Sequence, residues 1–196
     1  MDMREERAGQ SRKRLTARDW ADAALAAIGE RGLAGVAVEP LAARLGTTKG
    51  SFYWHFANRD ALIEAALARW EEIDTEEIIT ALEAEPDPER RLRTLFAQAT
   101  ALAAEDPLEV LLLATADDPH VAPVLQRVTE RRIGYVAHLF EELGLPPEEA
   151  RRRGLLAYTS YLGHAQLSHA VPESLPVGAE RRGYLDSVMD NLLRRG

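Results

Sequence analysis

The chain contains 196 residues, of which 46% are apolar and none is cysteine, and its formal net charge is −8. This length and composition permit a buried core in one or two small domains, and the lack of cysteine excludes disulfides and thiolate metal sites. The polar N-terminus and the absence of any apolar run of about 18 residues argue against a secretory signal or a membrane span. We therefore expect a globular, cytoplasmic protein.

The negative charge is unevenly distributed along the chain. Residues 1–60 carry ten Lys or Arg against eight Asp or Glu, net +2, whereas residues 61–196 carry 14 against 24, net −10. Residues 12–14, Arg-Lys-Arg, form a basic arm that either follows a phosphate backbone or minor groove or is a flexible, solvated tail. The acidity therefore belongs to the C-terminal part, and the N-terminal part remains a candidate for contact with a polyanion.

The first predicted helix begins at a capping box. Residues 16–19, Thr-Ala-Arg-Asp, place an aspartate three residues after a threonine, so each side chain can accept a backbone hydrogen bond of the other residue. Apolar residues at intervals of three and four continue this helix to about Gly32. A short helix is predicted over 39–45, and Gly46 suits a left-handed C-terminal cap.

A second short helix is predicted over 48–56, and the two short helices with the turn between them form a helix-turn-helix unit. At 100° per residue, Phe52 and Phe56 share one face and are predicted to be buried together. The rest of the surface carries small and hydrogen-bonding residues: Gly50, Ser51, Tyr53, Trp54 and His55. Small residues let the backbone approach base edges, and polar aromatic side chains can reach the phosphates on either side of a groove. The alternative is an ordinary surface helix with half-buried aromatic residues.

The residues next to this helix also favour contact with phosphates. Lys49 adds a positive charge at its beginning, and Thr48 is predicted as its N-cap, where the helix terminus is partly positive. Asn58 is predicted to cap the next helix, with Arg59 in the first turn as a further phosphate ligand.

The run from Leu41 to Leu62, LAARLGTTKGSFYWHFANRDAL, resembles the DNA-binding signature of the TetR family of transcriptional regulators. The match covers roughly residues 12–65. The resemblance implies operator contacts by Thr48, Lys49, Gly50, Ser51, Tyr53, Trp54 and His55, and phosphate binding by Arg59. One departure is visible, because family members often cap the helix before the turn with Ser or Thr, whereas this chain has Val-Ala-Val-Glu-Pro at 36–40.

The remaining sequence predicts helices only. A long amphipathic helix runs from Asn58 to about Ala84, and three Asp-Pro pairs start the next three helices, at 88–104, 107–115 and 119–143. Two more are predicted over 147–170 and 179–194, and no alternating β pattern is present. The expected fold is all-α with about nine helices. A helix-turn-helix DNA-binding domain, residues 1–60 with a flexible arm over 1–14, is joined by the long helix to a helical effector-binding and dimerisation domain, residues 61–196.

The last two helices predict a homodimer. Small residues leave little bulk along 154–170, and the final helix ends the chain with a broad apolar stripe, so these two helices and their copies can form a four-helix bundle. The alternative is packing within one chain. The predicted interface residues are Leu155, Tyr158, Leu162, Gly163, Leu167, Tyr184, Leu185, Val188, Met189 and Leu192.

No catalytic motif is readable, so we expect neither an enzyme nor a cofactor or metal site. The resemblance implies a small-molecule pocket in the C-terminal domain whose ligand alters the separation of the two DNA-binding units. Candidate lining residues, for which plain core is the alternative, are Trp70, Phe96, Gln98, Thr100, Thr115, Tyr135, His138 and His164. The predicted function is a homodimeric repressor that binds a palindromic operator in double-stranded DNA and is released by an effector. The alternatives are a DNA-binding regulator without an effector and a helical enzyme.

Overall fold

The computed structural model describes residues 15–194, so the predicted basic arm at 12–14 lies outside the described residues. Within that range the regular structure is helical and includes no strand. The helices are α1 (Ala17–Arg31), α2 (Val38–Arg44), α3 (Lys49–Phe52), α4 (Arg59–Glu71), α5 (Ile78–Leu82), α6 (Pro88–Glu105), α7 (Leu108–Ala114), α8 (Val121–Glu142), α9 (Pro147–Ala170) and α10 (Gly178–Leu193). A π-helical turn, η2 (Glu72–Glu77), joins α4 to α5 without a break, so residues 15–194 contain nine separate helices as predicted.

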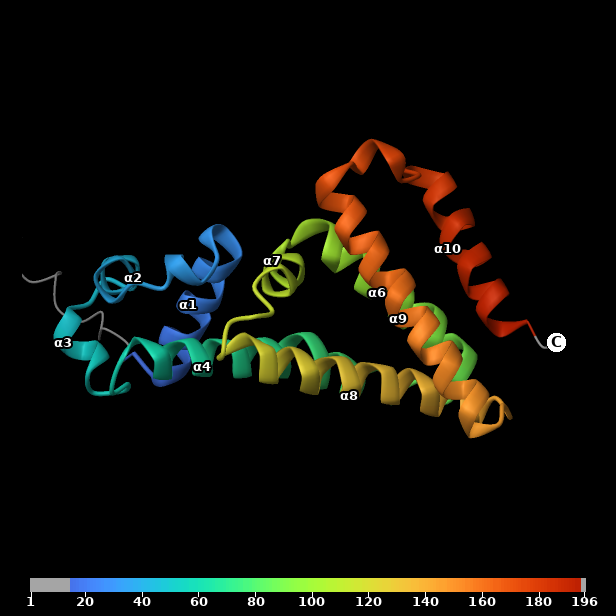
Figure 1. Ribbon diagram of the computed structural model, residues 1–196, viewed down its shortest axis with the longest axis horizontal. Helices are drawn as coiled ribbons and strands as arrows, with labels where there is room; N and C mark the ends of the chain where they lie inside the picture. Colours follow the sequence, from blue (N-terminus) through green and yellow to red (C-terminus); the bar gives the residue numbers. More distant parts are fainter. Residues whose placement is uncertain (1–14, 195–196) are drawn as a thin grey trace, which may run out of the picture.

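The molecule is elongated. Figure 1 shows α1, α2 and α3 at one end, α9 and α10 at the other, and α4 and α8 running along the length between them. We call residues 15–60 the head and residues 61–194 the body. None of the helices described is both long and apolar enough to cross a membrane.

Most helices begin where the sequence predicts. Thr16 and Asp19 form the reciprocal capping box, with the Thr16 hydroxyl accepting from the Asp19 amide at 3.2 Å and Asp19 Oδ2 accepting from the Thr16 amide at 2.7 Å. The three aspartates of the Asp-Pro pairs each accept a backbone N–H two residues later, at 2.8–3.0 Å. Because these bonds satisfy otherwise unpaired amides, they fix the starts of α6 and α7 close to the predicted positions. α8 begins two residues later than predicted, at Val121 rather than 119.

Two clusters of buried apolar side chains lie along the molecule. The first joins the head to the adjacent parts of α4, α7 and α8, and includes Trp20, Ile28, Leu41, Phe52, Leu62, Trp70, Leu112 and Val121. The second lies among α5, α6, α8, α9 and α10, and includes Ile79, Leu92, Phe96, Leu139, Phe140 and Met189. The head therefore shares its core with the body, which limits how far one can move without the other.

The small residues of α9 bring a helix of the same chain close. A Cβ placed on Gly154 would lie 3.0 Å from the carbonyl oxygen of Ile133 and 3.1 Å from the amide nitrogen of Ala137, both on α8. At Gly154 the small side chain therefore admits α8 of the same chain, which is the alternative of packing within one chain. At Gly163, by contrast, no atom of a neighbouring element within residues 15–194 lies within 4 Å of such a Cβ.

Candidate nucleic-acid interface and ligand cavity

The short helix α3 is held in place by its two phenylalanines. Phe52 is fully buried and Phe56 nearly so, and their rings stack with centroids 5.7 Å apart. Trp20 of α1 meets Phe52 edge-on at 5.5 Å. The predicted burial of this pair is confirmed, and it anchors α3 on the head core with its other side outward.

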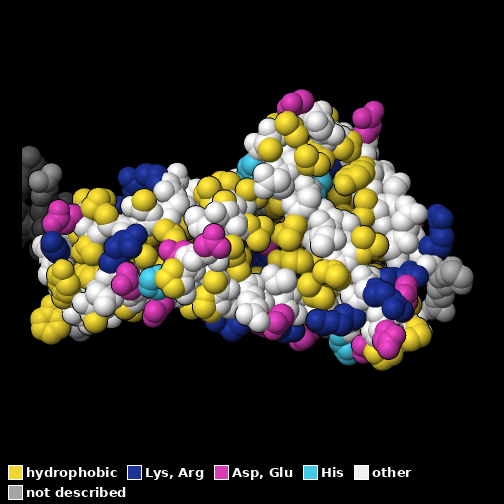
Figure 2. Space-filling model, viewed as in Figure 1, with side chains coloured by type: hydrophobic (Ala, Val, Ile, Leu, Met, Phe, Trp, Pro, Cys, Tyr) yellow, Lys and Arg dark blue, Asp and Glu magenta, His cyan; other side chains and the backbone are white. Residues whose placement is uncertain are grey.

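The helix is shorter than the predicted range of 48–56. It ends at Phe52, and hydrogen bonds from the amides of Trp54 and His55 to carbonyls three residues earlier tighten the following residues into a turn. Trp54 is 86% exposed and Tyr53 57% exposed. Gly50 and Thr48 are also exposed, whereas Ser51 and His55 are half-buried. Figure 2 shows apolar side chains standing out at this end of the molecule.

The two predicted phosphate ligands have partners within the head. Lys49 Nζ lies 2.9 Å from Glu39 Oε1, and this hydrogen-bonded pair raises the pKa of Lys49 and lowers that of Glu39. Arg59 donates from Nε to the carbonyl of Val36 at 2.7 Å and from Nη2 to the carbonyl of Leu33 at 2.5 Å. Arg59 therefore braces the loop before α2, and any contact of its guanidinium with a phosphate stays a prediction.

Of the two predicted N-caps, Asn58 and Thr48, one makes the expected hydrogen bond and the other does not. Asn58 accepts a hydrogen bond from the Ala61 amide at 2.8 Å and caps α4 as expected. Thr48 occupies the N-cap position of α3, but its hydroxyl makes no capping hydrogen bond. The amides at the beginning of α3 thus lack this side-chain acceptor.

The body encloses a cavity of about 340 Å³, lined by the α4–α5 segment and by α6, α7, α8, α9 and α10. Most of its lining is apolar, and hydrophobic side chains gather over this part of the molecule in Figure 2. Of the eight residues that the sequence suggested for a pocket, Phe96 and Tyr135 line this cavity.

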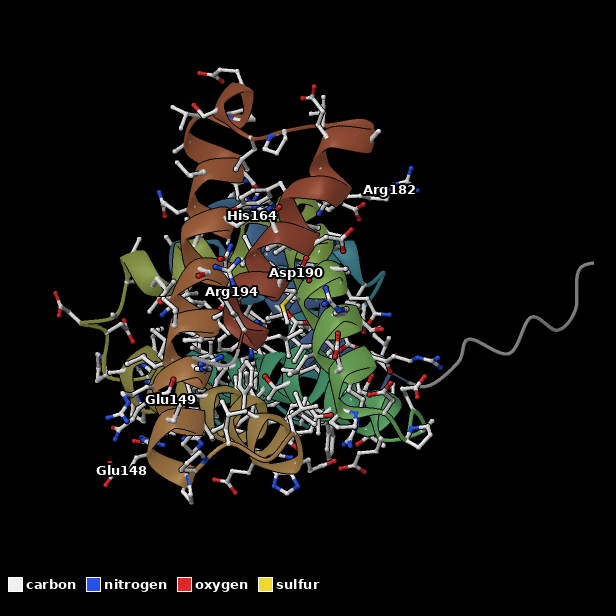
Figure 3. The ribbon with its side chains drawn as sticks, turned by 90° about the vertical axis from the view of Figure 1, so that its right-hand side faces the viewer. Glu148, Glu149, His164, Arg182, Asp190 and Arg194 are labelled. Carbon is white, nitrogen blue, oxygen red and sulfur yellow. The ribbon has the colours of Figure 1, made fainter. Side chains whose placement is uncertain are left out.

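The other six candidates lie elsewhere. Trp70 is buried in the core shared with the head, and the hydroxyls of Thr100 and Thr115 donate to carbonyls of their own helical turns. Gln98 and His138 are exposed, and His164 is buried between α9 and α10, where Figure 3 labels it, with its ring stacked on Tyr184. Helical periodicity alone did not separate residues that face the cavity from those that face a neighbouring helix.

A buried polar network forms part of the cavity wall. Arg132 Nη1 lies 2.8 and 2.9 Å from the two carboxylate oxygens of Glu109, which also accept hydrogen bonds from Tyr158 at 3.2 Å and Tyr161 at 2.5 Å. Burial acts to lower the pKa of Arg132, but the negative charge of Glu109 outweighs it, so the pKa is raised. Burial, together with Glu109, raises the pKa of Tyr161, which therefore stays a protonated donor. The network is a buried ion pair with its remaining hydrogen-bonding groups largely satisfied.

The same arginine contacts the helix that leads to the head. Arg132 Nε donates to the Thr75 hydroxyl at 2.9 Å and Nη2 donates to the carbonyl of Asp74 at 3.0 Å, both within the π turn η2. Its guanidinium also lies over the ring of Trp70, 5.4 Å from the centroid. A π turn leaves backbone groups out of the regular helical pattern, and here one such carbonyl faces the cavity wall.

Sequence reasoning missed Glu109, Arg132, Tyr161 and the π turn. One signal was available, because Arg132 falls in the apolar stripe of α8, four residues after Val128 and four before Val136. A charged residue at such a position indicates a buried, paired group. We find no such sequence signal for the π turn.

The predicted dimer residues divide into three groups by exposure. Tyr158, Leu185, Met189 and Leu192 are buried within the chain, so they are not available to a partner as the sequence suggested. The apolar side chains of α10 belong to the same buried cluster as residues of α5, α6 and α9. Leu162, Tyr184 and Val188 are half-buried, whereas Leu155, Gly163 and Leu167 are exposed on α9.

Comparison with known proteins bears on both parts of the molecule. The sequence profile of the family described as "Bacterial regulatory proteins, tetR family" matches residues 21–66. No curated protein sequence matches the chain. A transcriptional regulator from Rhodococcus sp. Rha1 has the same fold with a TM-score of 0.71 at 21% identity, over 91% of this chain and 94% of that one.

Two further structures with this fold contain ligands. AibR, solved with isovaleryl coenzyme A and operator DNA, gives a TM-score of 0.64 at 18% identity, over 90% of this chain and 97% of its own. FadR from Bacillus subtilis, solved with stearoyl-CoA, gives 0.65 at 14% identity, over 91% and 98%. Residues 21–66 thus match the profile of the TetR family of bacterial regulatory proteins, and almost the whole chain shares the fold of these solved structures.

Proposed function

We propose that the protein is a homodimeric repressor that binds a palindromic operator and leaves it when a small molecule occupies the body cavity. The observation that carries this proposal is the outer surface of α3 and its turn, where Tyr53 and Trp54 are exposed above a buried phenylalanine pair. Exposure of large aromatic rings to water is unfavourable, and a binding partner that covers them removes this cost. Here the two rings lie next to an exposed glycine and a lysine. A nucleic-acid groove suits that combination.

The dimer is supported by the outer face of α9. Leu155 and Leu156 are 51% and 55% exposed, and Gly163 leaves open space two turns further along the same helix. The outer face of α10 is charged instead, with Arg182 and Asp190 labelled in Figure 3. A second copy of α9 packed on this apolar face would bury it and would place two heads on one DNA duplex.

The release step is supported by the position of Arg132. It joins the cavity wall to the π turn of the helix that carries the head, and Glu109 joins the same network to α7, which packs on α1. A ligand that displaces any of these hydrogen bonds changes the relative stability of two arrangements of α4 and α7. A coupling free energy of about 1–3 kcal/mol between cavity and operator is typical of such regulators.

Selection of bound sequences from random DNA tests the operator proposal directly. We expect an inverted repeat whose half-sites lie about one helical turn apart or a multiple of it, because two heads related by a two-fold axis read successive major grooves. An enriched sequence without internal symmetry, or no enrichment, would contradict the proposal.

The contribution of single residues can then be measured on the selected operator. Tyr53→Ala should weaken binding by about 1–3 kcal/mol, since a hydrogen bond to a charged phosphate is lost. Lys49→Ala should reduce the slope of log affinity against log salt by about 1. The control is Arg90→Ala, an exposed arginine on α6 that should leave the slope unchanged.

The oligomeric state has its own test. Light scattering should give the mass of two chains, and Leu156→Glu should give the mass of one, because a buried charge opposes the apolar contact. Glu148→Gln, an exposed change at the beginning of α9, serves as the control. A wild-type mass of one chain at micromolar concentration would refute the dimer.

A further inference from the structure

The cavity has a charged end and an apolar end. Along the α4–α5 segment, Asp74 is followed one turn later by Ile78 and Ile79, and along α6 the lining changes from Leu92 near its beginning to Glu105 at its end. At 1.5 Å per residue, that stretch of α6 spans roughly 20 Å. The cavity therefore suits an elongated amphipathic molecule rather than a compact one.

Carboxylates dominate the charged end. Asp74, Glu105, Asp106 and Glu109 line it, and among the described lining residues Arg132 alone is a cation. The guanidinium of Arg132 is already committed, because its Nε and both terminal nitrogens donate to Thr75, Glu109 and the Asp74 carbonyl. An anionic ligand would therefore find no free guanidinium at this end unless the Glu109 pair were broken.

Two of the carboxylates have no ion pair among the described residues. Asp106 accepts the amide of Leu108 at 2.9 Å, and within residues 15–194 no Lys or Arg forms a salt bridge with its carboxylate or with the Asp74 carboxylate. Burial raises the pKa of Asp74, and the charges of Asp106 and Glu109 add to this effect against the opposing charge of Arg132. A ligand cation near these two carboxylates would relieve their repulsion, whereas a ligand anion would increase it.

Aromatic rings lie beside Glu109 at the charged end of the cavity. Tyr158 and Tyr161 line the cavity with their ring centroids 6.0 Å apart, and both hydroxyls are directed to Glu109. Aromatic faces attract alkylammonium groups through their quadrupoles, which adds to the attraction by carboxylates.

We propose that the effector is a lipophilic cation, with an amine or quaternary ammonium head at the Asp74 and Asp106 end and an apolar chain along α6 toward Leu92. This inference rests on the proposed effector function of the cavity. It separates this chain from AibR and FadR, whose structures contain acyl esters of coenzyme A, which are anions.

Three probes with the same ten-carbon chain test the proposal: decyltrimethylammonium, decanol and decanoate. Their binding to the full-length protein is measured by calorimetry without DNA. We expect the ammonium to bind at least about tenfold more tightly than decanoate, since unpaired carboxylates attract one head and repel the other. Decanoate binding as tightly as the ammonium, or no binding of the ammonium, would overturn the proposal.

Variants locate the head group. Asp74→Asn and Asp106→Asn should each weaken binding of the ammonium about fivefold or more and leave decanol within about twofold. Asparagine keeps the capping acceptor at 106, so α7 should be retained. Asp117→Asn, an exposed change in the turn after α7, is the matched control and should alter none of the three affinities. Wild-type affinity for the ammonium in both cavity variants would overturn the assignment.

A separate measurement keeps this proposal distinct from the proposed function. The ammonium is added to the complex of the protein with its selected operator, and release of DNA is followed by fluorescence anisotropy. Tight binding of the ammonium without release of DNA would support the ligand class and contradict effector-driven release.

Discussion

In the head, the core is apolar and the polar groups of interest lie on its outer surface, whereas in the body a charged network lies inside and exposed leucines lie outside. Phe52 and Trp20 fill the head core beneath the exposed Tyr53 and Trp54. In the body, Glu109 is buried against the largely covered side chain of Arg132, while Leu155 is half exposed. The difference matches the contacts that we propose for each part: a polyanion outside the head, a small molecule inside the body, and a second chain on α9.

The largest expected effect comes from breaking the network in the body. Arg132→Met leaves the Glu109 carboxylate buried without its cation, so the free energy of unfolding should fall by about 3–5 kcal/mol. Urea denaturation measures it. The neighbouring Arg131 pairs with Glu76 at the surface, and Arg131→Met should cost only about 0–1 kcal/mol. Equal losses in the two variants would show that the buried network is not a major source of stability.

A pair of aromatic substitutions tests the opposite arrangement in the head. Phe52→Ala removes a fully buried ring and should lower the free energy of unfolding by about 3–5 kcal/mol. Trp54→Ala, two residues later and 86% exposed, should change stability by less than about 0.5 kcal/mol but weaken operator binding. If Trp54→Ala destabilised the protein as Phe52→Ala does, the outer surface of α3 would belong to the fold rather than to an interface.

These contrasts explain which features could be predicted from the sequence. Short-range rules apply where the determinants lie close together in the chain, as with the capping box at Thr16, the phenylalanines four residues apart and the Asp-Pro helix starts. The fold class and nearly all helix starts follow from such local patterns. Even there, the turn that shortens α3 and the contacts of Arg59 with the Leu33 and Val36 carbonyls were not predicted.

The cavity depends on residues far apart in the sequence. Arg132 meets Glu109 across 23 positions and Asp74 across 58, and Tyr161 meets Glu109 across 52. Such contacts depend on how the helices pack, which periodicity within one helix does not determine. The same limit explains why Gln98 and His138, polar residues on amphipathic helices, were assigned to a pocket although both are exposed.

The two glycines of α9 distinguish contacts within the chain from contacts between chains. Gly154→Val places its Cβ only 3.0–3.1 Å from backbone atoms of α8 and should cost about 1–3 kcal/mol in unfolding free energy. Gly163→Val enters open space and should leave the monomer core intact, while its β-branched side chain changes the face proposed for the dimer. Denaturation and light scattering on both variants check this. If Gly154→Val were monomeric and as stable as the wild type, the contact between chains would lie at Gly154 rather than at Gly163.

The smallest effect concerns pH and the contact between α9 and α10. His164 is buried against Tyr184, and burial, aided by the positive charge of Arg181, lowers the pKa of its imidazole below the ordinary 6.5. Folding therefore favours the neutral ring. As pH falls below 6.5, the unfolded chain binds a proton that the folded chain does not, so the unfolding free energy decreases until the pH passes the folded pKa.

The slope of this decrease is at most about 1.4 kcal/mol per pH unit for one group. Urea midpoints of the wild type and His164→Gln at pH 7.5, 6.5 and 5.5 measure it, and the variant should lose less stability on acidification. His138→Gln is the matched control, because His138 is exposed beside Glu142 and its replacement leaves the α9–α10 contact unchanged. A stability difference between wild type and His164→Gln that stays constant across this range would mean that the imidazole titrates alike in the folded and unfolded chain. The folded body would then accept a protonated His164 near Arg181 at no cost. The interior of the body would then differ less from the surface of the head than we propose.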